Sequence, residues 1–160
     1  MKSKDLALVA LFTSLYVVAV ILLAPISFEV FQVRVADILM PLSIIFGMPA
    51  IFGLTIGAFI ANFASPFGII DVIGGSVANF IASYTAWIIG RRNFKGSWII
   101  AIFVENLIIT LIVGTYLSYL LTLPLVVGWF GIFLGSLISM NIGGYLLLKV
   151  LRIRLIQTHP

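Results

Sequence analysis

Four acidic residues lie in or beside hydrophobic stretches that are long enough to span a bilayer: Glu29, Asp37, Asp71 and Glu105. Arg34 is the basic residue near them. A charged side chain at membrane depth costs about 2.5–3.5 kcal/mol or more, unless it is paired or lines a wet cavity. A chain that keeps several such residues is therefore predicted to bind a polar solute within the membrane.

Arg34 and Asp37 are spaced i,i+3, so on a helix they share a face and can pair. Asn79 follows Asp71 by eight residues, about two helical turns, so the two face roughly the same way. Glu105 is expected deeper, in the inner half of the membrane, where an ionised carboxylate needs a partner unless it is protonated. The predicted substrate-binding residues are Arg34, Asp37, Asn62, Asp71, Asn79 and Glu105.

Plainer structural roles are open for five of these residues. Arg34 and Asp37 could form only a structural ion pair at the membrane interface. Asp71 could be a helix N-cap after the preceding Ser-Pro-Phe-Gly turn, because aspartate is favoured at that position. Asn62 and Asn79 could simply join helices by hydrogen bonds.

Aromatic residues are plentiful near the expected outer side, where they could stack against a flat ligand. Taken singly, most of them are equally well explained as lipid-facing or packing residues. The residues in question are Phe28, Phe31, Phe63, Phe67, Tyr116 and Tyr119.

The composition is that of a membrane protein, since 62% of the 160 residues are hydrophobic and only 9% are charged. A membrane-spanning helix needs about 20 apolar residues. The charge-free runs therefore hold five or six helices and leave no room for a soluble domain. These runs cover residues 6–24, 38–70, 72–90 and 106–148.

Breaks in the hydrophobic runs predict a single transmembrane domain over residues 1–160, folded as a compact all-α bundle of six membrane-spanning helices. Glycine, proline and basic loops separate the helices. Residues 26–35 alternate polar and apolar side chains and are expected as a short extended loop or a frayed helix entry. The expected helices cover about 5–24, 36–46, 49–63, 70–89, 97–121 and 125–150.

The basic residues indicate the orientation of the chain. With the N-terminus inside, eight of the nine lysines and arginines fall on cytoplasmic segments, as the positive-inside rule requires. We therefore expect a multi-pass protein of the cell membrane with both termini cytoplasmic, and we interpret the net charge of +4 as topological, with no nucleic-acid partner. Arg34 is the exception on the outer side.

Catalytic and cofactor-binding signals are missing from the sequence. There is no cysteine, which excludes disulfides and thiolate metal sites, and the single histidine, His159, lies in the basic tail. Walker, GxSxG and HExxH motifs do not occur. We expect no enzyme activity, no cofactor and no bound metal, and any ATPase domain must reside on another chain.

Small residues form a stripe on the first helix: Ala7, Ala10 and Ser14. Such a stripe lets another helix approach closely, so it is a candidate docking surface for a partner. Packing within the bundle is the alternative. Gly53 and Gly57 repeat the same spacing on the third helix and are expected to serve internal packing.

Two strings in the first 90 residues resemble the QueT family of small membrane proteins. One runs from Phe31 to Asp37 (FQVRVAD) and continues through residues 39–42. The other runs from Asn62 to Asp71 (NFASPFGIID) and is followed by Gly75-Ser76. The family pattern is similar to QxR-x-(S/A)-E-x-L and N-x-x-SP-x-G-x-x-D-x-x-x-GS. Asp37 departs from it, standing where glutamate is expected.

The resemblance implies six helices and the role of a substrate-capturing S component in an energy-coupling-factor (ECF) importer. Its partners would be a transmembrane coupling subunit, docked through Ala7, Ala10 and Ser14, and two ATPase subunits. The implied substrate is a queuosine precursor, a 7-deazaguanine such as 7-aminomethyl-7-deazaguanine. A carboxylate can accept both hydrogen bonds from the N–H/NH2 edge of such a ring.

Three other functions compete with this interpretation. The chain could be an S component for another vitamin or purine-like solute, which differs only in its pocket residues. It could be a membrane enzyme or a scaffold in lipid metabolism, although a membrane enzyme would be expected to show catalytic histidine, cysteine or paired carboxylates. It could also be a stand-alone proton-coupled carrier that uses Glu105 as a relay.

Overall fold

The computed structural model describes residues 2–27, 33–92 and 94–157; most of these residues are helical and none of them forms a strand. The predicted all-α fold is therefore confirmed. The elements are α1 (Ser3–Leu22), α2 (Ala24–Ser27), the 3-10 helix η1 (Val35–Leu42), α3 (Ser43–Phe46), α4 (Met48–Ala61), the 3-10 turn η2 (Asn62–Ala64), α5 (Ile69–Gly90), α6 (Ser97–Leu120), α7 (Leu125–Ser136), the π-helix η3 (Leu137–Gly144) and α8 (Tyr145–Gln157).

Four of the helical segments in the described part of the chain are long and apolar enough to cross a membrane: α1, α5, α6 and the continuous run Leu125–Ile153. Two shorter apolar helical segments, Val35–Phe46 and Met48–Ala64, complete the set of six that the hydrophobic runs predict. Val35–Phe46 ends at Gly47, whose positive φ of +60° breaks the helix.

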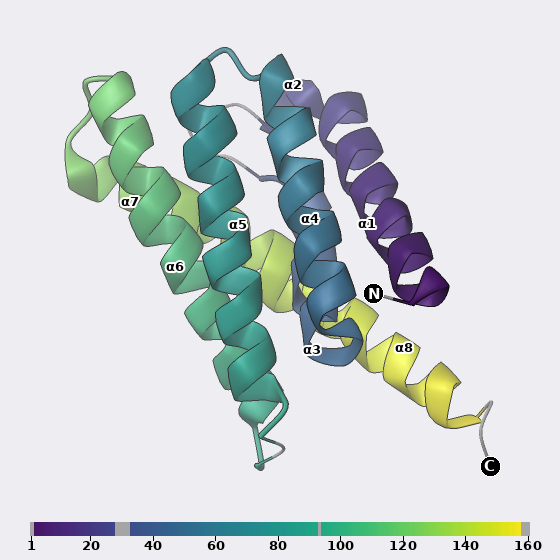
Figure 1. The fold of residues 1–160 in the computed structure, drawn as a ribbon. Coiled ribbons are helices and arrows are strands. Elements are labelled where there is room, and N and C mark those ends of the chain that lie inside the picture. The colour runs from purple at the N-terminus through teal and green to yellow at the C-terminus, as the bar shows by residue number, and fades with distance from the viewer. Residues whose placement is uncertain (1, 28–32, 93, 158–160) are drawn as a thin grey trace.

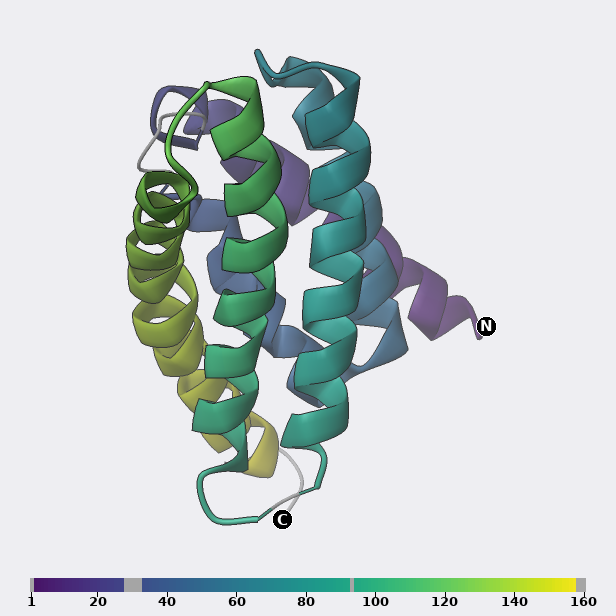
Figure 2. The same cartoon turned by 90° about the vertical axis from the view of Figure 1, so that its left-hand side faces the viewer.

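The long helices stand in a row in which α1 contacts α4, α4 contacts α5, α5 contacts α6, and α6 contacts α7 (Figure 1). The run from α7 to α8 crosses one side of this row (Figure 2). Between them lies η1, which contacts α1, α4, α5 and η3. This enclosure buries Ala36, Asp37 and Met40, so η1 can carry polar side chains into the centre of the protein.

The predicted helix breaks occur at glycines with a left-handed backbone. Gly47 has φ +60° and separates α3 from α4, with Pro49 at the start of the new helix. Gly68 has φ +68° and ends the turn before α5. The first helix stops earlier than predicted, at Leu22, and Pro25 lies within the short helix α2. Residues 28–32 of the expected loop lie outside the described residues.

The predicted last helix, 125–150, contains an eight-residue π-helical segment, η3, that the sequence did not reveal. The backbone of η3 lies close to η1. A Cβ built on Gly144 would lie 2.6 Å from Pro41 Cγ, and one on Gly143 would lie 3.0 Å from Ile38 Cγ1. The two glycines therefore let the backbones of η1 and η3 approach each other where the helix changes its winding.

The start of α1 and the end of α8 lie in the same half of the bundle as the α3–α4 turn and the α5–α6 loop (Figure 1). This end carries most of the basic residues, including Arg91 and Lys95 in the α5–α6 loop. Asp71, in the first turn of α5, lies toward the opposite end. We call these the basic end and the acidic end.

The contact between α1 and α4 depends on glycine, as the sequence predicts. A Cβ built on Gly53 would lie 2.6 Å from Phe12 Cβ and 2.8 Å from the carbonyl oxygen of Val9. One built on Gly57 would lie 2.8 Å from Tyr16 Cβ. The two glycines thus let α4 pack directly on the buried face of α1.

Gly53→Val is expected to lower the free energy of unfolding by about 1–3 kcal/mol, because the added side chain forces α1 away from α4. Denaturant unfolding of the purified protein in detergent measures the change. Ala10→Leu, which enlarges a residue on the outer face of the same helix pair, serves as the control and should leave stability nearly unchanged. Equal stability of Gly53→Val and the parent would contradict this account of the contact.

Candidate functional site

A buried hydroxyl, that of Tyr16, connects three elements near the middle of the bundle. It donates a hydrogen bond to Asp37 Oδ1 of η1 at 2.7 Å and accepts one from Asn79 Nδ2 of α5 at 3.0 Å. All three side chains are buried. The chain of hydrogen bonds fixes the carboxylate of Asp37, a residue that lines the adjoining cavity.

This cavity has one polar wall and one largely apolar wall. Its volume is about 10 Å³, which is room for about one water molecule. The polar wall consists of Arg34, Asp37 and Asn79, and the other wall consists of Ile109 and Val113 from α6 with Ile132 and Ser136 from α7. Three of the six predicted site residues therefore meet at one place.

Arg34 is buried beside this cavity although it is a cation. Arg34 occupies the N-cap position of η1, where its backbone is extended. Asp37 lies three residues later, in the first turn of η1. The charge of Arg34 acts on the carboxylates of both Asp37 and Asp71. Arg34 and Asp37 thus line the same cavity, although Arg34 stands at the extended N-cap and not within the helix that the i,i+3 spacing assumed.

A second cluster surrounds Asp71 at the acidic end. Tyr116 of α6 donates a hydrogen bond to Asp71 Oδ1, and Asn62 Nδ2 donates one to the backbone carbonyl of Asp71 at 3.0 Å. Asp71 Oδ2 and Asn62 Oδ1 are buried without a hydrogen-bond partner among the described residues. Two neighbouring residues therefore each keep one buried acceptor without a donor among the described residues.

The alternative that Asp71 is a helix N-cap is wrong, because Gly68 occupies that position and Asp71 lies in the first turn of α5. Its carboxylate still lies near the positive end of the helix dipole. The alternative that the two asparagines join helices is confirmed for one donor of each: Asn62 joins η2 to α5, and Asn79 joins α5 to α1.

Glu105 of α6 is fully buried but does not line the cavity. It precedes Ile109, a cavity residue, by four positions and so lies one turn away on the same helix face. Neither carboxylate oxygen has a hydrogen-bond partner in the described part of the chain. The hydroxyl of Ser83 lies nearby without meeting hydrogen-bond geometry, and the charge of Asp37 also acts on Glu105.

An amide network beside Glu105 joins α6 to the π-helical segment. Asn106 Nδ2 donates to Asn141 Oδ1 at 2.8 Å, and Thr110 Oγ1 donates to Asn106 Oδ1 at 3.1 Å. Asn141 lies inside η3. The network therefore links α6 to η3. This π-helical segment directly follows Ser136, a residue that lines the cavity.

The sequence missed Tyr16, which organises the site. Its spacing from Phe12 and Val20 places these three residues on one helix face, opposite the small-residue stripe, and this is the signal that could have revealed it. Tyr116 was one of the aromatic residues that could stack against a ligand, and the structure shows its hydroxyl donating a hydrogen bond to Asp71 Oδ1.

Two of the aromatic residues expected near the outer side are exposed on the surface of the bundle. Phe63 is 64% exposed and Tyr119 is 85% exposed, so neither forms a shelf for a ligand in this structure. Phe67 is partly buried and packs against the hydrophobic core. Phe28 and Phe31 lie outside the described residues.

The small-residue stripe Ala7, Ala10 and Ser14 lies on the exposed face of α1, with the hydroxyl of Ser14 donating to the carbonyl of Ala10 at 2.7 Å. The alternative that this stripe packs within the bundle is therefore wrong. The bundle contact of α1 is made by the opposite face, with Phe12 and Tyr16.

Comparison with known proteins identifies one family. The model of the QueT transporter family matches residues 6–153, nearly the whole chain. No curated protein and no solved structure gives a significant match. Among the described residues, no group of three or more histidine, cysteine, aspartate or glutamate side chains is placed to hold a metal ion.

Tyr16→Phe is expected to lower the free energy of unfolding by about 1–3 kcal/mol, because it removes the donor to a buried carboxylate and the acceptor for Asn79. Thermal and denaturant unfolding in detergent measure the loss. Tyr119→Phe is the matched control, since that hydroxyl is on a highly exposed side chain. If both variants unfold like the parent, the hydroxyl of Tyr16 does not hold the three elements together.

Proposed function

The chain belongs to the QueT transporter family, and from this premise we propose that it is the substrate-binding S component of an ECF-type importer. A transporter role agrees with the apolar helices and with the polar residues buried between them. In this proposal the chain catalyses no bond chemistry. It captures a small molecule on the outer side of the membrane and delivers it through partner subunits that hydrolyse ATP.

The proposed substrate is a 7-deazaguanine that serves as a queuosine precursor. The observation that carries this proposal is the set of buried acceptors without partners in the described structure: Asp71 Oδ2, Asn62 Oδ1 and both oxygens of Glu105. A guanine-type ring presents adjacent N–H and NH2 donors that a carboxylate can accept together. Leaving such acceptors unpaired costs about 1–3 kcal/mol each, and a ligand that pairs them recovers this free energy.

The balance of buried charge supports a cationic ligand. The buried charged side chains in the described structure are three acids, Asp37, Asp71 and Glu105, and one base, Arg34. An aminomethyl group on the ligand carries a positive charge at neutral pH and would offset this excess of acid. The shorter side chain of Asp37, where the family pattern favours glutamate, leaves more space beside it and could alter which 7-deazaguanine binds best.

Asp71, Asn62 and Glu105 do not line the small cavity beside Asp37 in this structure, so binding requires the walls of the cavity to separate until it reaches these residues. Small-molecule pockets typically measure about 300–1,000 Å³, whereas the cavity here measures about 10 Å³. The apolar wall of Ile109, Val113 and Ile132 suits the face of a flat ring, and the polar wall suits its edge. We propose that the structure represents the closed arrangement of the site.

The proposed orientation puts the basic end of the bundle in the cytoplasm, as the positive-inside rule favours, and the acidic end outside. Both termini are then cytoplasmic and the chain crosses the membrane six times. The exposed stripe Ala7, Ala10 and Ser14 would dock on the transmembrane coupling subunit, which carries two ATPase subunits. The whole chain would then topple, turning its site toward the cytoplasm.

A stand-alone proton-coupled carrier is the second candidate, and Glu105 favours it. A buried carboxylate without a hydrogen-bond partner is a feature that proton-coupled carriers use as a relay. Uptake into liposomes that contain this chain alone would support the carrier. Uptake that requires the coupling and ATPase subunits would support the S component.

Asp71→Asn and Glu105→Gln are each expected to weaken binding of 7-aminomethyl-7-deazaguanine at least tenfold, because each replaces a charged acceptor by an amide. Calorimetric titration of the detergent-purified protein measures affinity, and mass spectrometry identifies any ligand that co-purifies. Asp5→Asn, in the first turn of α1 near the basic end, is the control. Unchanged affinity in both variants, with the fold intact, would remove the proposed site. Tight binding of a different flat nitrogenous solute would keep the importer and change its substrate.

Ala10→Leu is expected to abolish assembly with the coupling subunit while ligand affinity stays unchanged, because the larger side chain prevents close helix approach. Co-purification of the complete complex measures assembly. Ala10→Ser keeps a small residue at the same position and should assemble normally. Normal assembly of Ala10→Leu would mean that another surface docks the partner.

A further inference from the structure

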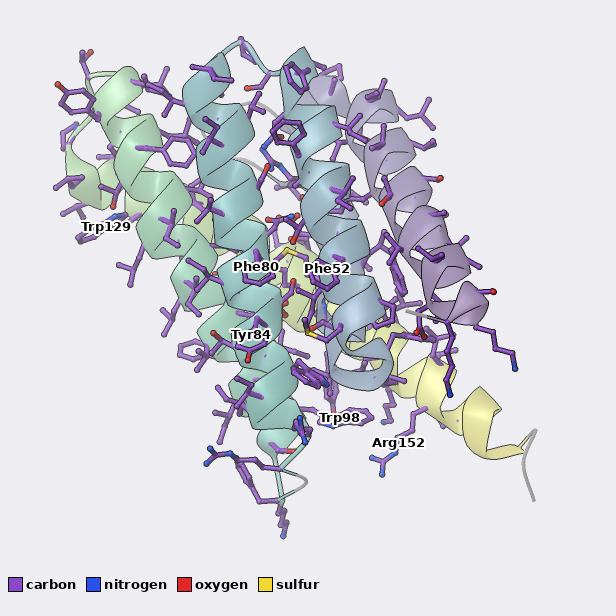
Figure 3. The ribbon with its side chains drawn as sticks, in the orientation of Figure 1. Phe52, Phe80, Tyr84, Trp98, Trp129 and Arg152 are labelled. Carbon is purple, nitrogen blue, oxygen red and sulfur yellow. The ribbon has the colours of Figure 1, made fainter. Side chains whose placement is uncertain are left out.

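A hollow of about 360 Å³ lies at the basic end, far from the cavity of the substrate site, between the start of α6 and α8. Its volume falls in the range of about 300–1,000 Å³ that is typical of small-molecule sites. The residues that matter for its chemistry are Lys95, Ser97, Trp98, Ile99, Tyr145 and Arg152. Figure 3 shows Trp98 and Arg152 at this end of the molecule.

The hollow is built to receive an anion. Lys95 and Arg152 line it, and none of the described residues around it is acidic. The guanidinium of Arg152 lies 4.7 Å from the centre of the Trp98 ring, a cation–π contact that holds the charge in place. The hollow also borders the positive end of α6, a helix of 24 residues whose N-cap, Gly96, has no side chain to cap it.

An apolar hollow of about 200 Å³ continues from the first one. It is lined by Ile99, Ile102, Asn141 and Tyr145, so the two hollows share Ile99 and Tyr145. Ile102 lies one turn further along α6, away from the α5–α6 loop, and Asn141 lies about one turn back along the antiparallel run. The combined groove therefore has basic side chains at its outer end, near the α5–α6 loop. Its other end is lined by mainly apolar side chains and lies toward the membrane interior.

We propose that this groove binds one anionic phospholipid from the cytoplasmic leaflet. The phosphate lies between Lys95 and Arg152, and an acyl chain follows Ile99 and Ile102. A free phosphate would use the basic hollow alone, whereas a lipid uses both hollows. A zwitterionic lipid is disfavoured because no acidic side chain among the lining residues pairs with its amine. This site is separate from substrate binding and extends the transport role to lipid dependence.

Titration of the detergent-purified protein with phosphatidylglycerol, followed by native mass spectrometry, tests the proposal. We expect one phosphatidylglycerol bound per chain and at least tenfold weaker retention of phosphatidylcholine. The double variant Lys95→Gln/Arg152→Gln should weaken phosphatidylglycerol binding at least tenfold. The double variant Lys95→Arg/Arg152→Lys keeps both charges and should retain the lipid, which separates loss of charge from loss of fold.

Arg92→Gln/Lys149→Gln is the matched control, because it removes two charges from the same end outside the groove. An equal loss of lipid in this control would overturn the proposal in favour of diffuse charge attraction. Equal retention of phosphatidylcholine would overturn it as well. Glycerol 3-phosphate that binds as tightly as phosphatidylglycerol would assign the hollow to a soluble anion and exclude the lipid.

Discussion

The hydroxyl of Tyr16 provides hydrogen bonds for polar side chains that are buried within the bundle. Polar groups buried away from water must find partners within the chain, because lipid offers none. By donating to Asp37 and accepting from Asn79, this one oxygen joins α1, η1 and α5. It thereby holds η1 inside the bundle, and with η1 it holds Arg34 beside the cavity. The positions of Asp37 and Asn79 at the cavity therefore depend on this contact.

Small residues lie on both sides of α1: the glycines of α4 meet its buried face, and its own small residues form its exposed face. Gly53 and Gly57 of α4 receive the buried face of α1 at a distance that no other residue permits. The alanines and serine on the opposite face of α1 remain exposed. In a membrane the hydrophobic effect does not drive helices together, so close packing of small residues is a main source of association. Helix α1 can therefore pack against the bundle with one face and leave the opposite face exposed for a partner.

The two ends of the bundle differ in charge and in the ligands that suit them. The acidic end and centre hold more buried carboxylates than buried cations, and several of their oxygens lack donors in the described structure. The basic end holds lysines and arginines, two of which line an open groove that runs into apolar surface. A cationic, donor-rich solute suits the first, and an anionic amphiphile suits the second. The π-helical segment lies between them and anchors Asn141 to Asn106.

The sequence alone determined the helical class, the six apolar segments, the turns at Gly47 and Gly68, and the separation of basic from acidic ends. These depend on local chemistry and on long runs of apolar residues. It also grouped Arg34, Asp37 and Asn79 in one site. Only the tertiary structure revealed Tyr16 as their link, the first-turn position of Asp71, the π-helical segment and the outward face of the alanine stripe. The physical reason is that membrane-spanning helices are apolar all round, so their sequences do not distinguish the side that meets protein from the side that meets lipid.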